Sequence, residues 1–155
     1  SFALQIYFLG SRFRQVKEIR ESGKNIVQDR TIYEDAHIFA ENLYDMNLLS
    51  DRDFNNYSSV FNLMKSFVSA PDLLIYLKSD VPNLVKKIYK RGRDYEATIS
   101  IEYLSKLNQK YEKWISTYNE GKLLVIEVDD LDFVERPEDF GYILERIENQ
   151  MHGLF

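Results

Sequence analysis

The sequence predicts an α/β fold of three layers, in which a parallel sheet carries helices on both faces. Three short segments rich in apolar or β-branched residues have the length of strands, at Asn25–Gln28, Leu73–Leu77 and Leu123–Val128. The longer stretches around them carry apolar residues every three or four positions, as amphipathic helices do. These helical stretches are long enough to connect parallel strands, so the alternation favours a parallel sheet.

Size and composition fit a single domain over residues 1–155. Of the 155 residues, 45% are hydrophobic and 14% are aromatic, which is enough for one core. The chain contains no run of about 18 apolar residues, and its first residues lack the basic start and small-residue cleavage site of a signal peptide. We therefore expect a soluble, cytoplasmic protein that does not enter a membrane.

The residue types disfavour several kinds of site. Cysteine is absent, and the two histidines, His37 and His152, lie far apart in the sequence, so we expect no metal held by protein side chains. The net charge of −5 disfavours a general nucleic-acid surface. Any basic cluster should therefore be local and directed at a small ligand.

The first helix is predicted over Phe2–Ile19, and Ser22 with Gly23 supplies its end. The amphipathic pattern starts at once, with no methionine and no cap, so we expect the chain to be a piece of a longer protein. The first predicted strand, Asn25–Gln28, follows this helix, and a more irregular segment lies between Ile38 and Tyr44.

The later helices follow from apolar stripes with a start or stop signal at one end. The first of them is predicted over Phe54–Val68, with Asp51 or Asp53 as its cap. The second starts at Asp80 and Pro82 and ends at Gly92. The last two run from about Ser100 to Tyr118 and from Pro137 to Met151.

The stretch from Asn25 to Asp35 is the first candidate for function. Its predicted strand runs into Asp29 and Arg30, and Asp35 follows five residues after Arg30. Open α/β sheets bind ligands outside the carboxyl ends of their strands, so these charged groups fit a ligand crevice. An ion pair with no function, at the end of a strand, explains Asp29 and Arg30 equally well.

A basic cluster between Lys86 and Glu96 is the second candidate. It contains Lys86, Lys87, Lys90, Arg91 and Arg93 around the helix-breaking Gly92. Lys87 and Arg91 are four residues apart and share one helix face. Such a cluster can clamp phosphates and stabilise a transferring phosphoryl group, or it can be an ordinary solvated helix face.

Gln5 and Arg12 form a third candidate. They are seven residues apart, which is two helical turns, and therefore lie on nearly the same face as Phe8 and Leu9. A glutamine amide offers both a donor and an acceptor to the edge of a nucleobase. The alternative is surface polarity unrelated to Asp35.

Five segments resemble, in order and over essentially the whole chain, the deoxynucleoside kinase family, especially its bacterial deoxyadenosine and deoxyguanosine kinases. They read FALQIYFLGSR, QDRTIYED, PDLLIYL, KRGRDYE followed by ISIEYLSKLNQKYEKWI, and LLVIEVDDLDF. The resemblance implies a P-loop kinase fold. It also implies transfer of the γ-phosphoryl group of ATP, with Mg²⁺, to the 5′ hydroxyl of a deoxynucleoside, with a preference for a purine one, by a homodimer.

The resemblance also implies roles for individual residues. The base is contacted by Gln5, Arg12 and Asp35 and stacks on Phe39, while the sugar is contacted by Glu96 and Tyr103. Arg30, next to Asp29, lies near the 5′ oxygen and the phosphates. The lid over the ATP phosphates comprises Lys87, Arg91 and Arg93, and the loop that packs against the ATP adenine comprises Asp129, Asp130, Leu131, Asp132 and Phe133.

Two departures from the family pattern stand out. Thr31 replaces a frequent serine, which changes little. More importantly, no glycine begins the phosphate-binding pattern GxxxxGK[ST], so this loop, its strand and the catalytic glutamate would precede Ser1. We expect residues 1–155 alone neither to bind ATP nor to fold robustly.

Two other functions remain open: a non-catalytic nucleotide-binding or interaction module, and a nucleoside monophosphate kinase. The sequence does not rank deoxyadenosine against deoxyguanosine or deoxycytidine. The helix Phe54–Val68 carries more aromatic surface than one core face needs, and we expect a homodimer that forms through this helix and the first one.

Overall fold

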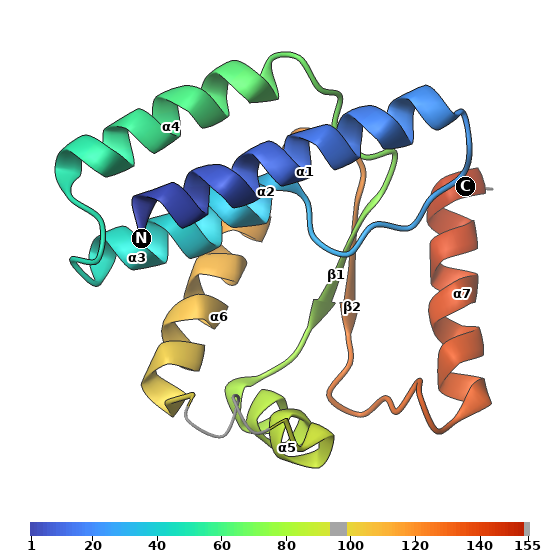
Figure 1. The fold of residues 1–155 in the computed structure, drawn as a ribbon. Coiled ribbons are helices and arrows are strands. Elements are labelled where there is room, and N and C mark those ends of the chain that lie inside the picture. Colours follow the sequence, from blue (N-terminus) through green and yellow to red (C-terminus); the bar gives the residue numbers. More distant parts are fainter. Residues whose placement is uncertain (94–98, 154–155) are drawn as a thin grey trace. The chain divides into compact units, whose positions relative to one another are not determined.

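The computed structural model describes residues 1–93 and 99–153, and these residues form two compact units (Figure 1). The first unit comprises residues 1–69 and 109–114, and the second comprises residues 70–108 and 115–155. Each unit has its own buried residues, and each is described separately below.

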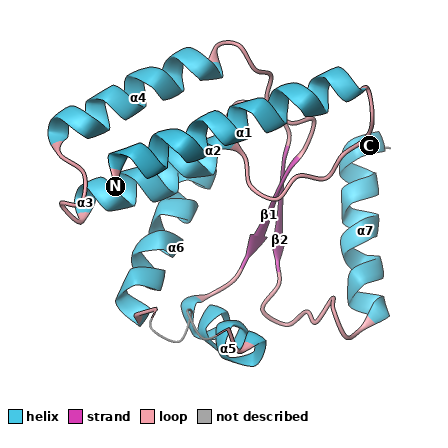
Figure 2. Cartoon of the chain, in the orientation of Figure 1, coloured by secondary structure: helices cyan, strands magenta, loops and turns pink. Residues whose placement is uncertain are grey.

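Helices make up the first unit (Figure 2). The long helix α1, Phe2–Ser22, lies beside α4, Asp51–Lys65. Between them in sequence lies a helical segment that packs against both. It is divided into α2 (Ile32–Glu34), η1 (Asp35–Ala40) and α3 (Glu41–Asp45). The core of this unit includes Leu9, Ile32, Ile38, Tyr57 and Phe61.

The predicted strand at Asn25–Gln28 is wrong. These residues are extended but pair with no strand in the described part of the chain, and Val27 is 98% exposed. A strand exists only where a neighbouring backbone accepts and donates its hydrogen bonds. Asp29 and Arg30 therefore lie in an extended connection between α1 and α2, and not at the end of a strand.

Two other predictions in this region need correction. The irregular segment between Ile38 and Tyr44 is helical, and η1 is a π-helical stretch within it. The cap of α4 is Ser50, whose side chain accepts a hydrogen bond from the Asp53 backbone N–H at 3.1 Å; it is neither Asp51 nor Asp53. The helix also ends at Lys65, so Phe67 and Val68 lie beyond it.

The second unit contains the parallel sheet. Strands β1, Leu74–Lys78, and β2, Leu123–Glu127, pair in parallel with Leu74 opposite Leu123. Between them lie α5, Val81–Arg91, and α6, Ile101–Ser116, whose residues 109–114 belong to the first unit. The prediction of an α/β fold with a parallel sheet is confirmed, with both later strands placed within one residue of the expected bounds.

Helix α7, Pro137–His152, packs against β2 and closes the core of the second unit. That core contains Leu124, Ile126, Val128 and Ile143, with Leu131 and Phe133 packed on it. Among the described residues, none of the helices combines the length and the apolar character that crossing a bilayer would require.

Candidate functional site

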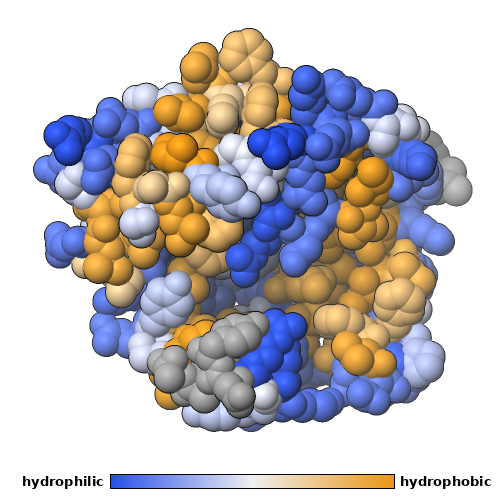
Figure 3. Space-filling model, in the orientation of Figure 1, coloured by the Kyte–Doolittle hydropathy of each residue, from blue (hydrophilic) through white to orange (hydrophobic). Residues whose placement is uncertain are grey.

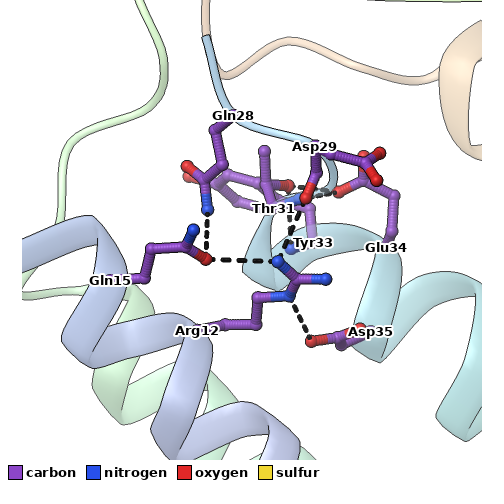
Figure 4. Close-up of polar contacts among 8 residues, drawn as sticks. All are labelled: Arg12, Gln15, Gln28, Asp29, Thr31, Tyr33, Glu34 and Asp35. Carbon is purple, nitrogen blue, oxygen red and sulfur yellow. Dashed lines mark hydrogen bonds and ion pairs between the residues drawn. The ribbon is translucent and has the colours of Figure 1, made fainter. Parts of the chain in front are cut away.

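A hydrogen-bonded cluster in the first unit joins α1 to the start of η1 (Figure 4). The guanidinium of Arg12 donates to the backbone carbonyl of Asp29 at 3.0 Å and to Oε1 of Gln15 at 3.1 Å. Its Nε lies 3.6 Å from Oδ2 of Asp35. Arg12 therefore ties the connection after α1 to the carboxylate of Asp35.

Asp35 is a buried acid with incomplete polar contacts. Its side chain is 10% exposed, and its Oδ2 has no hydrogen-bond partner among the described residues. Burial raises the pKa of Asp35, and the positive charge of Arg12 opposes that rise. A buried carboxylate that is only partly satisfied can accept a hydrogen bond from a ligand.

Local sequence explains where α2, the turn just before η1, begins. Thr31 and Glu34 form a capping box: the backbone N–H of Thr31 donates to Oε2 of Glu34 at 2.8 Å, and the Thr31 side chain accepts from the backbone of Tyr33 at 3.2 Å. The Thr31 hydroxyl also donates to Glu34. This box fixes the first turn and, one residue later, the position of Asp35. The pattern TIYE was readable in the sequence and was missed.

Arg30 adopts a backbone conformation that is unusual for a residue with a side chain. Its φ is 62°, in the left-handed region, where strain collects at functional positions. Its guanidinium carbon lies 4.6 Å from the centre of the Phe39 ring. A cation over an aromatic face is stabilising, so this contact helps to hold the strained backbone. Two of the predicted site residues, Arg30 and Phe39, are therefore in contact.

Gln5 lies on the inner face of α1 with Leu9. It is 7% exposed. Phe8 lies three residues after Gln5 and four before Arg12, at the edge of this face, and is 44% exposed. The seven-residue spacing of Gln5 and Arg12 did place both residues on one side of the helix.

The basic cluster lies on and just after α5 in the second unit. Gly92 ends this helix with φ 64°, a left-handed conformation that glycine adopts without strain, and Arg93 follows it. The ammonium of Lys87 donates to the carbonyl of Val128 at 3.1 Å, and that of Lys90 lies 3.3 Å from Oδ2 of Asp132. Arg91 and Arg93 are exposed.

The loop after β2 is held by many hydrogen bonds. Asp129 accepts from the hydroxyl of Ser79 at 2.6 Å and from the backbone of Asp80, the cap of α5, at 3.1 Å. The Ser79 hydrogen bond is the main cause of the lowered pKa of Asp129. Further along, the carbonyl of Asp130 accepts from Arg136, and the backbone of Asp132 donates to Asp139. This loop and the start of α5 therefore form one connected structure.

Comparison with known proteins identifies the family. The deoxynucleoside kinase family model matches residues 1–152. The chain belongs to the deoxynucleoside kinase family. It is 38% identical to the deoxyadenosine/deoxycytidine kinase of Bacillus subtilis, over 98% of this chain and 71% of the relative. It is also 38% identical to the deoxyadenosine kinase of Dictyostelium discoideum, over 93% of this chain and 58% of that enzyme.

Solved structures of the family agree with the fold. A deoxyadenosine kinase from M. mycoides, with the products dCMP and a flexible dCDP bound, superposes with a TM-score of 0.79 at 30% identity. The match covers 96% of this chain and 73% of that one. The predicted P-loop kinase type of fold is therefore confirmed. Deoxycytidine kinases, such as that of Rattus norvegicus, are among the relatives, so family membership leaves open whether a purine or a pyrimidine is preferred.

The two units hold different parts of the predicted site. The first unit brings together Arg12, Asp29 and Asp35, pairs Arg30 with Phe39, and buries Gln5. The second unit holds the remaining described candidates, which are Lys87, Arg91, Arg93, Tyr103 and the loop from Asp130 to Phe133. Glu96 lies outside the described residues.

Proposed function

We propose that the whole protein transfers the γ-phosphoryl group of ATP to the 5′ hydroxyl of a deoxynucleoside and prefers a purine one. The observation that carries this proposal is the buried, incompletely bonded carboxylate of Asp35, held beside Arg12 in a chain of the deoxynucleoside kinase family. The named activities of the B. subtilis and D. discoideum relatives support an adenine-containing substrate.

The residues of the first unit suit a nucleobase. Gln5 offers a carbonyl oxygen and an amide N–H₂ from a buried position, and Asp35 offers acceptor oxygens. Adenine and cytosine both present an amino group next to an unprotonated ring nitrogen, so one amide can pair with either. Arg12 balances the charge of Asp35 and fixes its orientation, and Phe39 supplies a ring on which a base can stack.

The residues of the second unit suit a polyphosphate. Arg91 and Arg93 are exposed around a left-handed glycine, and Lys87 is one turn earlier. Guanidinium groups stabilise the charge on a phosphoryl group during its transfer, and in this proposal Arg91 and Arg93 have that role. In the first unit, Asp29 and Arg30 are the residues that we assign to the reacting 5′ oxygen. The loop from Asp130 to Phe133 would then pack against the ATP adenine, and Tyr103 and Glu96 would contact the sugar.

Mg²⁺ is expected with ATP, but the residues that the structure describes do not form a site for it. The described part of the chain contains no group of three histidine, aspartate or glutamate side chains able to hold a metal. The 155 residues also contain no GxxxxGK[ST], the loop whose hydroxyl binds Mg²⁺ in P-loop kinases. We therefore propose that the phosphate loop and the catalytic base lie in a segment of the whole protein outside these residues.

The same proposal includes a cytoplasmic homodimer that acts in nucleotide salvage. Helix α1 exposes Leu4, Tyr7 and Phe8, which lie three and four residues apart on one face, and α4 exposes Leu63. Apolar surface gathers over these helices in Figure 3. A contiguous apolar surface of this kind commonly mediates contact between subunits.

A substrate panel tests the proposed function. The whole protein is incubated with γ-labelled ATP and with four deoxynucleosides and their 5′ monophosphates, and the labelled products are separated. We expect label in deoxynucleoside monophosphates, with deoxyadenosine or deoxyguanosine giving the highest kcat/KM. Label in diphosphates alone would indicate a monophosphate kinase, whereas binding of ATP with no product would indicate a non-catalytic module.

A further inference from the structure

Three buried polar atoms of the first unit have no hydrogen-bond partner among the described residues, and two of them form a donor and acceptor pair on neighbouring helices. One is the acceptor Oδ2 of Asp35, and the other is the hydroxyl of Tyr57, a donor. Tyr57 is 1% exposed and lies in α4, which packs against η1, the helix that carries Asp35. An unpaired polar group in a protein interior costs free energy, so both atoms require an explanation.

The electrostatics link these two residues. Burial first, and then the negative charge of Asp35, raise the pKa of Tyr57, so its hydroxyl keeps its proton at neutral pH and remains a donor. The other charged or titratable groups that act on Asp35 are Arg12 from α1, and Arg30 and Glu34 from the segment before η1. Tyr111 of α6 also interacts with Asp35, and burial chiefly raises its pKa to about 12.

We propose that Tyr57 is a positioning residue for Asp35, whose hydroxyl donates to Oδ2 of the carboxylate when a deoxynucleoside is bound. Oδ2 is the oxygen that faces Arg12, so this hydrogen bond would hold the carboxylate between Arg12 and Tyr57 and leave Oδ1 for the base. The inference rests on the proposed function, because it takes Asp35 as a base-contacting residue.

A second acceptor competes for the Tyr57 hydroxyl. Oδ1 of Asn42 is also buried without a hydrogen-bond partner in the described part of the chain, while its Nδ2 donates to Sδ of Met46 at 3.4 Å. Asn42 lies in α3, which also packs against α4. The experiment must therefore distinguish a hydrogen bond to Asp35 from one to Asn42.

The first measurement is the pH dependence of kcat/KM for the deoxynucleoside in the whole protein carrying Tyr57→Phe. Loss of a donor to the charged carboxylate favours its protonated form, so the acid limb should move to higher pH by about one unit. We expect kcat at saturating nucleoside to fall much less than kcat/KM. The control is Tyr44→Phe, which removes an exposed hydroxyl that donates to Asp51 at 3.1 Å. An unmoved limb, or an equal shift in the control, overturns the proposal.

The second measurement does not depend on phosphoryl transfer. The rise in Tm produced by the deoxynucleoside is compared for Tyr57→Phe in the wild-type background and in the Asp35→Ala background, which has no side-chain acceptor at position 35. We expect Tyr57→Phe to reduce this rise only where Asp35 is present. A reduction of equal size in both backgrounds assigns the hydroxyl to Asn42 and overturns the proposal.

The two proposals fail in different ways. If the wild-type protein phosphorylates no deoxynucleoside, the proposed function is wrong. If the wild-type protein is active and Tyr57→Phe matches it in pH profile and in ligand-induced Tm, only the role of Tyr57 is wrong. Tyr57→Phe keeps the ring and removes a hydroxyl that is unpaired in this structure, so the Tm without ligand should not fall.

Discussion

Asp35 is the candidate base-contacting residue of the first unit that is both buried and titratable. Burial raises the pKa of Asp35, and the positive charge of the nearby Arg12 guanidinium opposes that rise. If the charged form binds the base, kcat/KM falls on the acid side as pH drops through this raised pKa. A solvent-exposed aspartate would lose its charge only at lower pH.

Replacement of Arg93 tests the proposed phosphate-binding residues. Arg93→Ala in the whole protein should lower kcat by about 10²–10³-fold, because it removes charge stabilisation from the transferring phosphoryl group. KM for the deoxynucleoside should change little, since Arg93 belongs to the unit that holds the phosphate-binding candidates. Steady-state kinetics with varied nucleoside separates the two constants.

The matched control for Arg93→Ala is Lys86→Ala. Lys86 is an exposed cation of the same cluster, and its ammonium contacts only the side chain of Asn83, at 3.4 Å, among the described residues. Its replacement should leave kcat nearly unchanged. If Arg93→Ala also turned over at the wild-type rate, the lid role of Arg93 would be wrong.

Helix α1 serves two purposes with its two faces. Its inner face carries Gln5, Leu9 and Arg12, which belong to the core and the candidate site. Its outer face carries Tyr7, which is 68% exposed, next to Phe8. An exposed face of this kind is unfavourable in water, so a partner surface is its expected use.

The homodimer is therefore predicted to depend on α1. Wild-type whole protein should sediment as a dimer at micromolar concentration, and Tyr7→Glu should sediment as a monomer because it places a charge in the apolar contact. Val134→Glu is the control, since Val134 is 80% exposed but lies in the other unit. A monomeric wild type, or a dimeric Tyr7→Glu, contradicts this assignment.

At the scale of the whole molecule, the connection after α1 exposes apolar side chains to solvent. Ile26 is 47% exposed and Val27 is 98% exposed, and neither pairs with a strand in the described part of the chain. The chain spans 71% of the B. subtilis relative and 58% of the D. discoideum one.

Residues 1–155 produced alone should therefore show no ATP-dependent phosphorylation of deoxynucleosides and no rise in Tm with ATP. The reason is that none of these residues forms the phosphate loop that the family uses. The comparison is the whole protein assayed under the same conditions. Phosphorylation of deoxyadenosine by the purified 155-residue chain would show that this prediction is wrong.

Local sequence patterns were sufficient for several elements. Asp80 caps α5, Pro82 lies in its first turn and Gly92 ends it, as the sequence predicts, because capping and left-handed turns depend on a few neighbouring residues. The strand lengths of β1 and β2 also followed from their continuous apolar runs. The choice of Ser50 over Asp51 as the cap of α4 was not predictable, because any of these residues can accept the same hydrogen bond.

Tertiary structure decided what the patterns could not. The segment Asn25–Gln28 has strand composition but no strand beside it, and pairing is a property of two segments that can be far apart in sequence. In the same way, the sequence places Tyr57 in a predicted helix but does not indicate that its hydroxyl is buried. Its unpaired hydroxyl, and the burial that raises the pKa of Asp35, arise from the packing of α4 against η1. Short-range forces shaped the helices and their ends, whereas burial and long-range contacts determined which polar groups remain available for a ligand.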